Sequence, residues 1–263
     1  MKKHIVTSIY SFAFDFTLFT SFFSNIAFLG NSGTGKTMIA KKFGKILACL
    51  GIFVRETVNI KSRSDLVGQY IGKTAIRTKN ALWRSLEGIL FIDEAYQLAP
   101  SSARDYGGEA ITEMVNFLDK YIGCIVVIVA GYEKEMGRFF ESNQGLSRRF
   151  PTIFFLSDYS RSELCDIFIG IVEKNMVVEK YLANLFYSHI LHLPPENISK
   201  AGGDMLNLAS TFLRIKSSLR IPWSKKNASK IVGKAFFDYC NGRDRILRKK
   251  WERERGAAGA SKT

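Results

Sequence analysis

Short apolar runs alternate with segments of helical spacing through the first 160 residues, and helical spacing alone continues beyond them. Five runs have strand character and lie at 25–29, 55–60, 88–92, 124–130 and 152–156. After the first run, apolar residues recur at helical spacing from Met38 to Leu47. Fully apolar runs of this length, separated by helical segments, are typical of a parallel sheet covered on both faces. The pattern predicts an α/β fold followed by a helical region.

The change to purely helical spacing predicts a domain boundary at Asp158. The expected helices beyond it are Ser160–Asn175, Glu179–Leu191, Gly203–Leu219 and Asn227–Cys240. We therefore predict an α/β core over 25–158 and a small all-helical domain over 159–241. A charged segment with a tail that cannot form a core, predicted to be disordered, follows over 242–263. A chain of 263 residues is long enough for one large domain and one small one.

Residues 1–24 form an apolar, Phe-rich segment behind a basic start. Such a start resembles a signal peptide or an anchor, but there is no small-residue cleavage site. Asp15 lies in the middle of the run, where it opposes membrane insertion by ~2.5–3.5 kcal/mol. A membrane role is therefore disfavoured. A buried element on the core and a start that is not native remain as interpretations.

The net charge of +14 is unevenly distributed. From Lys200 onward there are 16 Lys or Arg and 5 Asp or Glu, so +11 of the charge lies in the last 64 residues. This bias fits an acidic partner, nucleic acid or a membrane surface, and equally a solvated basic face. Four cysteines lie far apart, which supports neither a zinc site nor a disulfide framework. A reducing, ATP-containing compartment is expected, either the cytoplasm or an organelle stroma or matrix.

A glycine-rich loop with a lysine connects the first strand to the first helix. A strand, a Gly-x4-Gly-Lys-Thr loop and a helix together are the context of a phosphate-binding P-loop. Glycines let backbone N–H groups approach phosphate oxygens, and the start of the following helix favours the same negative charge. Lys36 is expected to reach the β- and γ-phosphates, and the Thr37 hydroxyl to ligate Mg²⁺. The predicted nucleotide-binding residues are Gly30, Asn31, Ser32, Gly33, Thr34, Gly35, Lys36, Thr37 and Met38.

Two acids, Asp93 and Glu94, follow the fully apolar run 88–92. Functional groups of parallel sheets gather at the carboxyl ends of the strands. We expect Asp93 to hold Mg²⁺, directly or through water, and Glu94 to act as general base on the attacking water. Helix capping is the alternative role for the two acids.

Two further stretches have either a functional or a structural interpretation. Tyr70 and Ile71 lie between Gly68 and Gly72, where they either grip a partner from a Gly-hinged loop or pack into the core. Arg148 and Arg149 precede an aromatic residue, where they either form a surface turn or donate charge to a neighbouring subunit's γ-phosphate.

In this order, these motifs resemble the AAA+ ATPases, and most closely the group containing CbbX-type Rubisco activases and stage V sporulation protein K-like ATPases. The resemblance runs from about Asn25 to about Ala209. The stretches that carry it are 30–37, 65–74, 89–96, 104–107, 130–132, 141–143 and 157–159. It implies a hexamer of identical or related subunits, with Tyr70 and Ile71 on the loop that grips a polypeptide. It also implies a second pore loop at Arg104–Gly107, with Arg149 as the arginine finger and Arg148 as a reserve. Tyr132 or its neighbours would occupy the first sensor position.

The sequence departs from the family pattern at two places. Residues 1–24 do not look like the segment that covers the adenine in the family. The lid's sensor arginine would align near Gly203, where no arginine occurs, and Lys200 is a substitute only by conjecture.

The leading function is an ATP-driven protein remodeller. The alternative is a nucleic-acid-associated ATPase that uses the basic C-terminal third, with Trp223 and Trp251 as stacking residues. A third interpretation is a nucleotide-binding module with weak turnover, which the two departures support.

Overall fold

The computed structural model describes residues 25–70, 72–102, 105–193, 195–198, 201–218 and 227–242. The chain divides into two compact units. The first contains the opening strand and runs on from Gly35 to Ser157, whereas the second contains Ser32–Thr34 and the chain from Asp158 onward. Each unit has its own buried apolar core.

The first unit is built on a five-stranded sheet in the order β2-β3-β4-β1-β5, and every pairing is parallel. Its central strands are apolar throughout and are buried, as expected for a sheet covered on both faces. The strands are β1 Ile26–Gly30, β2 Val58–Lys61, β3 Ile89–Ile92, β4 Val126–Gly131 and β5 Thr152–Leu156.

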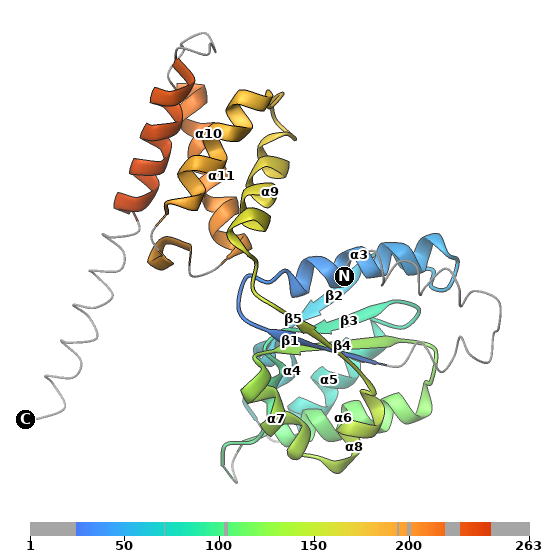
Figure 1. Ribbon diagram of the computed structural model, residues 1–263. Helices are drawn as coiled ribbons and strands as arrows, with labels where there is room; N and C mark the ends of the chain where they lie inside the picture. The colour runs from blue at the N-terminus through green and yellow to red at the C-terminus, as the bar shows by residue number, and fades with distance from the viewer. Residues whose placement is uncertain are drawn as a thin grey trace, which may run out of the picture. The chain divides into compact units, whose positions relative to one another are not determined.

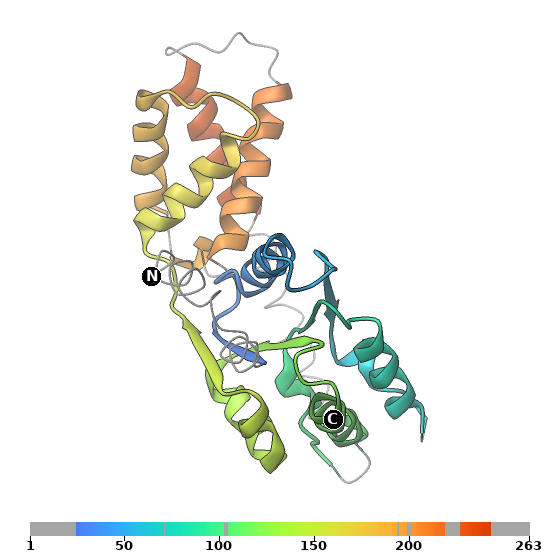
Figure 2. The same cartoon turned by 90° about the vertical axis from the view of Figure 1, so that its right-hand side faces the viewer.

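Helices cover both faces of this sheet (Figures 1 and 2). Helix α3 packs on one face, where its Leu47 is buried in the same cluster as Phe28 and Phe91. The other face carries the remaining helices, whose apolar side chains pack with Leu29 and Val129. The helices are α3 Lys36–Cys49, α4 Arg63–Leu66, α5 Lys73–Trp83, α6 Gly107–Lys120, α7 Glu133–Glu141 and α8 Gln144–Arg149, with a 3₁₀ helix η1 at Ala95–Leu98.

The second unit is helical in all of its described elements. A capping box formed by Ser160 and Glu163 starts its first helix. Phe168, Phe186 and Phe212 meet in its core, where Phe186 lies 4.8 Å and 5.1 Å from the other two rings. Its elements are α9 Arg161–Val172, α10 Lys180–Leu191, the 3₁₀ helix η2 Pro195–Ile198, α11 Gly202–Ser218 and a helix over 227–242. Among the residues described, no helix combines the length and the apolar character needed to cross a membrane.

The predicted parallel sheet with flanking helices, followed by a helical region, is confirmed. The predicted strand at 55–60 is partly wrong, because β2 covers only Val58–Lys61. Arg55 instead donates its backbone N–H to the carbonyl of Glu87, outside the parallel ladder. Helices α4 to α8 were not predicted individually.

Candidate nucleotide site

The glycine-rich loop joins the carboxyl end of β1 to the start of α3. A Cβ atom on Gly30 would lie 2.4 Å from the carbonyl oxygen of Leu156 on β5, so no larger residue fits there. Gly35 is the N-cap residue of α3 and has a left-handed backbone with φ 90°. The loop therefore delivers the chain directly to a helix N-terminus, whose free N–H groups favour an anion.

Lys36 closes over the loop that precedes it. Its Nζ donates to the carbonyl oxygens of Gly30, at 2.7 Å, and Asn31, at 2.8 Å. The same ammonium lies 5.9 Å from the centre of the Tyr132 ring, immediately beyond β4. The Lys36 ammonium is therefore already held within the loop, where it can interact with a bound anion.

The other predicted nucleotide-binding residues differ in exposure. Thr34 is buried, and within the second unit its carbonyl accepts a hydrogen bond of 2.9 Å from the hydroxyl of Tyr159. Thr37 is half-buried at the start of α3, whereas Met38 is 52% exposed. Asn31 and Ser32 are exposed, and Gly33 is half-buried.

Asp93 and Glu94 follow β3 at the same edge of the sheet as the loop, because all strands run parallel. Asp93 is half-buried, and Glu94 is exposed with a left-handed backbone at φ 49°. Gln97 donates its side-chain amide to the Glu94 carboxylate. The carboxylate of Asp93 at this edge fits the oxygen-ligand preference of Mg²⁺.

Two tyrosine rings lie close to Lys36 and to the segment that carries Asp93 and Glu94. The rings of Tyr96 and Tyr132 lie 6.0 Å apart, and Tyr132 faces Lys36 as described above. Burial, followed by the charge of Glu94, raises the pKa of Tyr96. Tyr132, predicted at the first sensor position, therefore lies between the loop lysine and the segment that carries Glu94.

Arg63 and Asp105 form a pair that the sequence did not indicate. Arg63 at the start of α4 places Nη2 2.6 Å from Oδ1 of Asp105, and its Nη1 donates to the carbonyl of Gln97. Burial raises the pKa of Asp105, but hydrogen bonds from Arg63 and from the N–H groups of Gly107 and Ser101 outweigh it and hold that pKa well below its usual range. The pair thus connects α4 to the chain that follows Glu94 in sequence, from Gln97 to Asp105.

Tyr70 is 64% exposed on the loop between α4 and α5, so the interpretation that it packs into the core is wrong. The Lys73 ammonium lies 5.0 Å from the centre of its ring. Ile71 and Arg104 lie outside the described residues. Gly107, the end of the predicted second loop, is the first residue of α6.

Arg148 and Arg149 end helix α8 and do not form a turn. Arg148 is exposed. Arg149 is held by an ion pair with Asp119, at the end of α6. Thirty residues separate the two, so no spacing in the sequence pointed to this partner.

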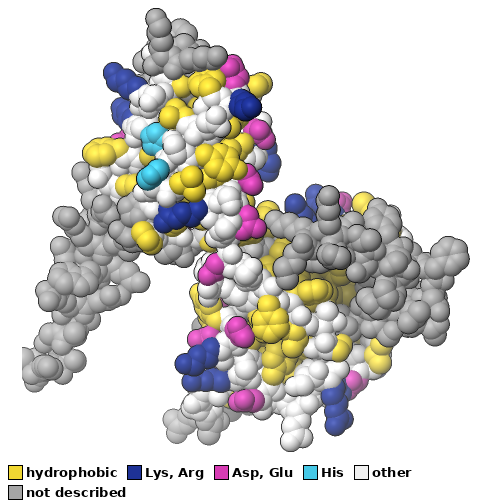
Figure 3. Space-filling model, viewed as in Figure 1, with side chains coloured by type: hydrophobic (Ala, Val, Ile, Leu, Met, Phe, Trp, Pro, Cys, Tyr) yellow, Lys and Arg dark blue, Asp and Glu magenta, His cyan; other side chains and the backbone are white. Residues whose placement is uncertain are grey.

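The predicted departures fall in the second unit or outside the described residues. Gly203 lies in the first turn of α11. Residues 1–24, Lys200, Trp223 and Trp251 are outside the described part of the chain. On the face drawn in Figure 3, the described Lys and Arg side chains form small, separate groups among acidic ones.

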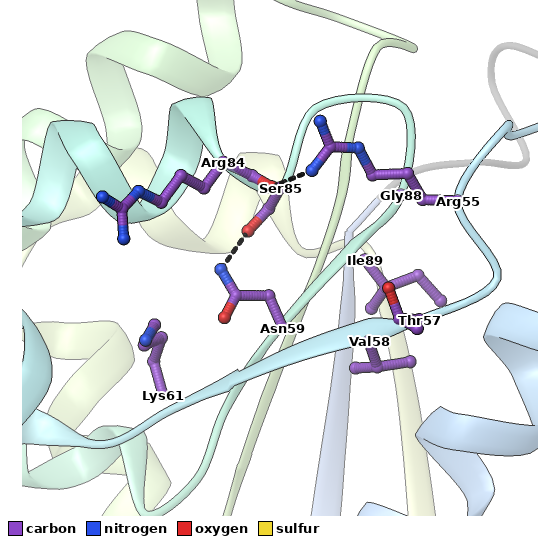
Figure 4. Close-up of a pocket in the computed structure, with 9 residues that line it drawn as sticks. All are labelled: Arg55, Thr57, Val58, Asn59, Lys61, Arg84, Ser85, Gly88 and Ile89. Atoms are coloured by element: carbon purple, nitrogen blue, oxygen red, sulfur yellow. Dashed lines mark hydrogen bonds between the residues drawn. The ribbon is translucent and has the colours of Figure 1, made fainter.

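A pocket of about 400 Å³ lies beside β2, at the edge of the sheet, with two strands between β2 and the strand that carries the loop. In Figure 4, Asn59 donates to Ser85, and Arg55 donates to the carbonyl of Arg84. Arg84 is the C-cap residue of α5 and Arg55 donates to its carbonyl, so both cations lie at the end of a helix where positive charge is favoured. They therefore do not indicate an anion site. The lining is Arg55, Thr57, Val58, Asn59, Lys61, Arg84, Ser85, Gly88 and Ile89.

Residues 26–157 match the family model described as ATPase family associated with various cellular activities (AAA). The likeness to the CfxQ and stage V sporulation protein K group, expected from the motifs, is confirmed by curated relatives. One is the Protein CfxQ homolog of Galdieria sulphuraria, 44% identical over 151 residues, which cover 57% of this chain and 50% of the relative. Another is Protein CfxQ of Xanthobacter flavus, 46% identical over 144 residues (54% and 45%).

A third relative is Stage V sporulation protein K of Bacillus subtilis, 41% identical over 143 residues (54% and 44%). The chain thus spans half or less of the length of these relatives. Among solved structures, a RuvB mutant of Thermotoga maritima superposes with a TM-score of 0.56 at 16% identity, covering 81% of this chain and 61% of that one. This last likeness concerns the fold alone.

Proposed function

Because residues 26–157 match the AAA family model, the chain belongs to the AAA family of ATPases. From this premise we propose that it hydrolyses ATP to remodel a protein substrate or to thread it through the pore of a hexamer. One observation carries the proposal. The loop Gly30–Thr37, with its inward lysine, and the acids Asp93 and Glu94 lie at one edge of a parallel sheet. Phosphate binding and water activation require these two groups together.

The loop supplies the binding energy for ATP. The Gly30 position leaves no room for a side chain, and the N-terminus of α3 offers N–H groups and the positive end of its dipole. On binding, Lys36 exchanges the carbonyls of Gly30 and Asn31 for the β- and γ-phosphate oxygens. This exchange replaces neutral acceptors with charged ones, which form stronger hydrogen bonds.

Thr37 and Asp93 are the residues that would hold Mg²⁺. When bound, the ion neutralises charge that develops on the phosphate oxygens. The fit rests on a hydroxyl at the first turn of α3 and a half-buried carboxylate at the end of β3. Both are oxygen ligands of the kind that Mg²⁺ takes in proteins.

Glu94 acts as the general base and takes a proton from the water that attacks the γ-phosphate. Its carboxylate accepts a hydrogen bond from the side-chain amide of Gln97. In a hexamer, Arg149 of one subunit stabilises the charge on the γ-phosphate in the next. The exposed Tyr70, with Ile71 beside it in the sequence, contacts the protein substrate.

Two substitutions test the nucleotide chemistry. Lys36→Ala should abolish ATP binding, because the phosphates lose their cationic partner. Glu94→Gln should leave binding intact and lower turnover ~10²–10⁴-fold, because only proton transfer is lost. Calorimetric titration with ATP and phosphate release measure the two effects. Lys41→Ala on the exposed side of α3 is the matched control and should behave like the parent. Parental turnover by Glu94→Gln would disprove the assignment of the base.

A mixing experiment tests the hexamer. Arg149→Ala should bind ATP normally and lose turnover by ~10³–10⁵-fold, the range for an arginine finger. Lys36→Ala cannot hydrolyse ATP but still presents Arg149 to its neighbour. Mixing the two inactive variants should therefore restore activity. Oligomers without any restored activity would argue against an arginine that acts between subunits. Salt-sensitive binding of single-stranded DNA by the parent would favour the nucleic-acid alternative instead.

A further inference from the structure

Arg149 is fixed to the sheet through its main chain. The buried side chain of Asn25, just before β1, donates through Nδ2 to the carbonyl oxygen of Arg149 at 2.9 Å. The same side chain accepts from the N–H of Val127 on β4, also at 2.9 Å. The end of α8 is therefore tied to two central strands, and the backbone of Arg149 has little freedom to move.

The guanidinium of Arg149 is oriented by two neighbours. Its Nε donates to Oδ1 of Asp119 at 2.8 Å, and its Nη2 donates to the other carboxylate oxygen of the same residue. Its Nη1 donates to the carbonyl of Gly145 at 2.9 Å. The side chain is only 24% exposed. These bonds engage three of the five N–H donors of a guanidinium and leave two for an incoming phosphate.

From this geometry we propose that Asp119 is a positioning residue for Arg149, which aims its guanidinium at the γ-phosphate bound by the neighbouring subunit. This inference rests on the function proposed above for Arg149. A planar, bidentate pair fixes direction as well as distance, which a single hydrogen bond does not. Asp119 itself is 54% exposed, and exposed ion pairs add little to stability. Its contribution therefore lies in the orientation of the guanidinium.

Gly145 completes the arrangement by leaving space for the guanidinium. A Cβ atom at this position would lie 2.9 Å from Nη1 of Arg149 and 2.9 Å from Oδ1 of Asn143. Such contacts force the guanidinium or the cap of α8 to shift. Replacement by alanine should thus displace Arg149 without touching Asp119.

The first test is Asp119→Asn, which keeps the size of the side chain and removes the bidentate acceptor. We expect kcat for ATP to fall about 10–100-fold, because a displacement of about 1 Å has an effect of this size. The KM for ATP and the melting temperature should stay at the parental values. Asp119→Glu should recover part of kcat. Glu113→Gln, which removes a charge elsewhere on α6, is the control and should be unchanged.

Mixed oligomers separate positioning from a role in the subunit's own nucleotide site. Asp119→Asn mixed with Lys36→Ala should regain turnover, because intact arginines from Lys36→Ala subunits then serve intact ATP sites. Asp119→Asn mixed with Arg149→Ala should gain nothing, because neither subunit presents an oriented guanidinium. Rescue in the second mixture, or its absence in the first, would overturn the proposal.

Gly145→Ala should give the same loss of kcat at constant KM. Gly137→Ala on α7, where an added Cβ meets no atom within 4 Å, is the matched control and should be as active as the parent. If Arg149→Ala is inactive while Asp119→Asn has parental kcat, Asp119 is not the positioning residue and the proposed function stands. If Arg149→Ala itself has parental kcat, both the arginine finger and its positioning fail. A lowered melting temperature for Asp119→Asn would make its role structural and overturn the proposal.

Discussion

At the scale of single residues, the side chain of Tyr70 lies on the surface and is not part of a buried apolar core. It is 64% exposed, and the Lys73 ammonium lies 5.0 Å from the centre of its ring. Tyr70→Ala should therefore change the free energy of unfolding of the first unit by no more than about 1 kcal/mol. Tyr239→Ala, at a tyrosine 6% exposed, is the matched comparison and should lose about 3–5 kcal/mol. Chemical denaturation measures both, and equal losses would return Tyr70 to a structural role.

Asp105 makes stability depend on pH. Its pKa is depressed in the folded state, so its contribution is complete above the unfolded pKa of about 3.9 and is lost as pH falls below it. Asp105→Asn should lower the free energy of unfolding of the first unit by about 3 kcal/mol at pH 7, because the half-buried Arg63 loses its ionic partner. The difference from the parent should shrink as the pH falls below about 4. A constant difference from pH 7 to pH 3 would contradict the assignment.

The residues of the candidate nucleotide site could be picked out from the sequence because their chemistry lies in consecutive positions. Gly30 to Thr37 and the pair Asp93 and Glu94 are short patterns, and the fold only had to bring their two strands to one edge. The partners of Arg63 and Arg149 lie 42 and 30 residues away in sequence. Such pairs depend on how α4, α6 and α8 pack, and no local pattern encodes that packing.

At the scale of elements, the junction between α6 and η1 is set by one glycine. A Cβ on Gly107 would lie 2.2 Å from the carbonyl oxygen of Leu98 and 2.9 Å from Nη1 of Arg63. Gly107→Ala should therefore destabilise the fold by about 1–3 kcal/mol, as overpacking does. Gly108→Ala, one residue on, meets only a carbon atom of Pro100, at 3.7 Å, and should be neutral or slightly stabilising. Thermal unfolding of the pair checks this, and equal melting temperatures would contradict it.

Elements could be predicted where one apolar pattern decides them. The run Thr152–Leu156 is a strand with the predicted bounds, and the helices after Asp158 end within three residues of their predicted ends. Strand β2 began later than predicted because Arg55 bonds to Glu87 outside the ladder. Among helices α4 to α8, only α4 and α7 directly follow a strand. The start of α6 depends on tertiary contacts such as those of Gly107.

At the scale of the whole molecule, the chain holds separate apolar cores. Phe91, fully buried in the sheet, belongs to the first unit. Phe186, fully buried against Phe168 and Phe212, belongs to the second. In the described part of the chain, the buried side chains of the second unit form a cluster apart from those of the first. Stability should therefore be divided between two cooperative blocks, and a single free energy of unfolding would not describe the protein.

Two core substitutions test this division by calorimetry. Phe91→Ala and Phe186→Ala each remove a fully buried ring and should destabilise their own unit by about 3–5 kcal/mol. If the units unfold as separate blocks, each variant lowers one heat-absorption peak and leaves the other at its parental temperature. Phe237→Ala, at a ring 66% exposed on the helix over 227–242, is the control and should move neither peak. A single peak lowered by both buried substitutions would mean that the two cores melt together, and the predicted division at Asp158 would then have no thermodynamic meaning.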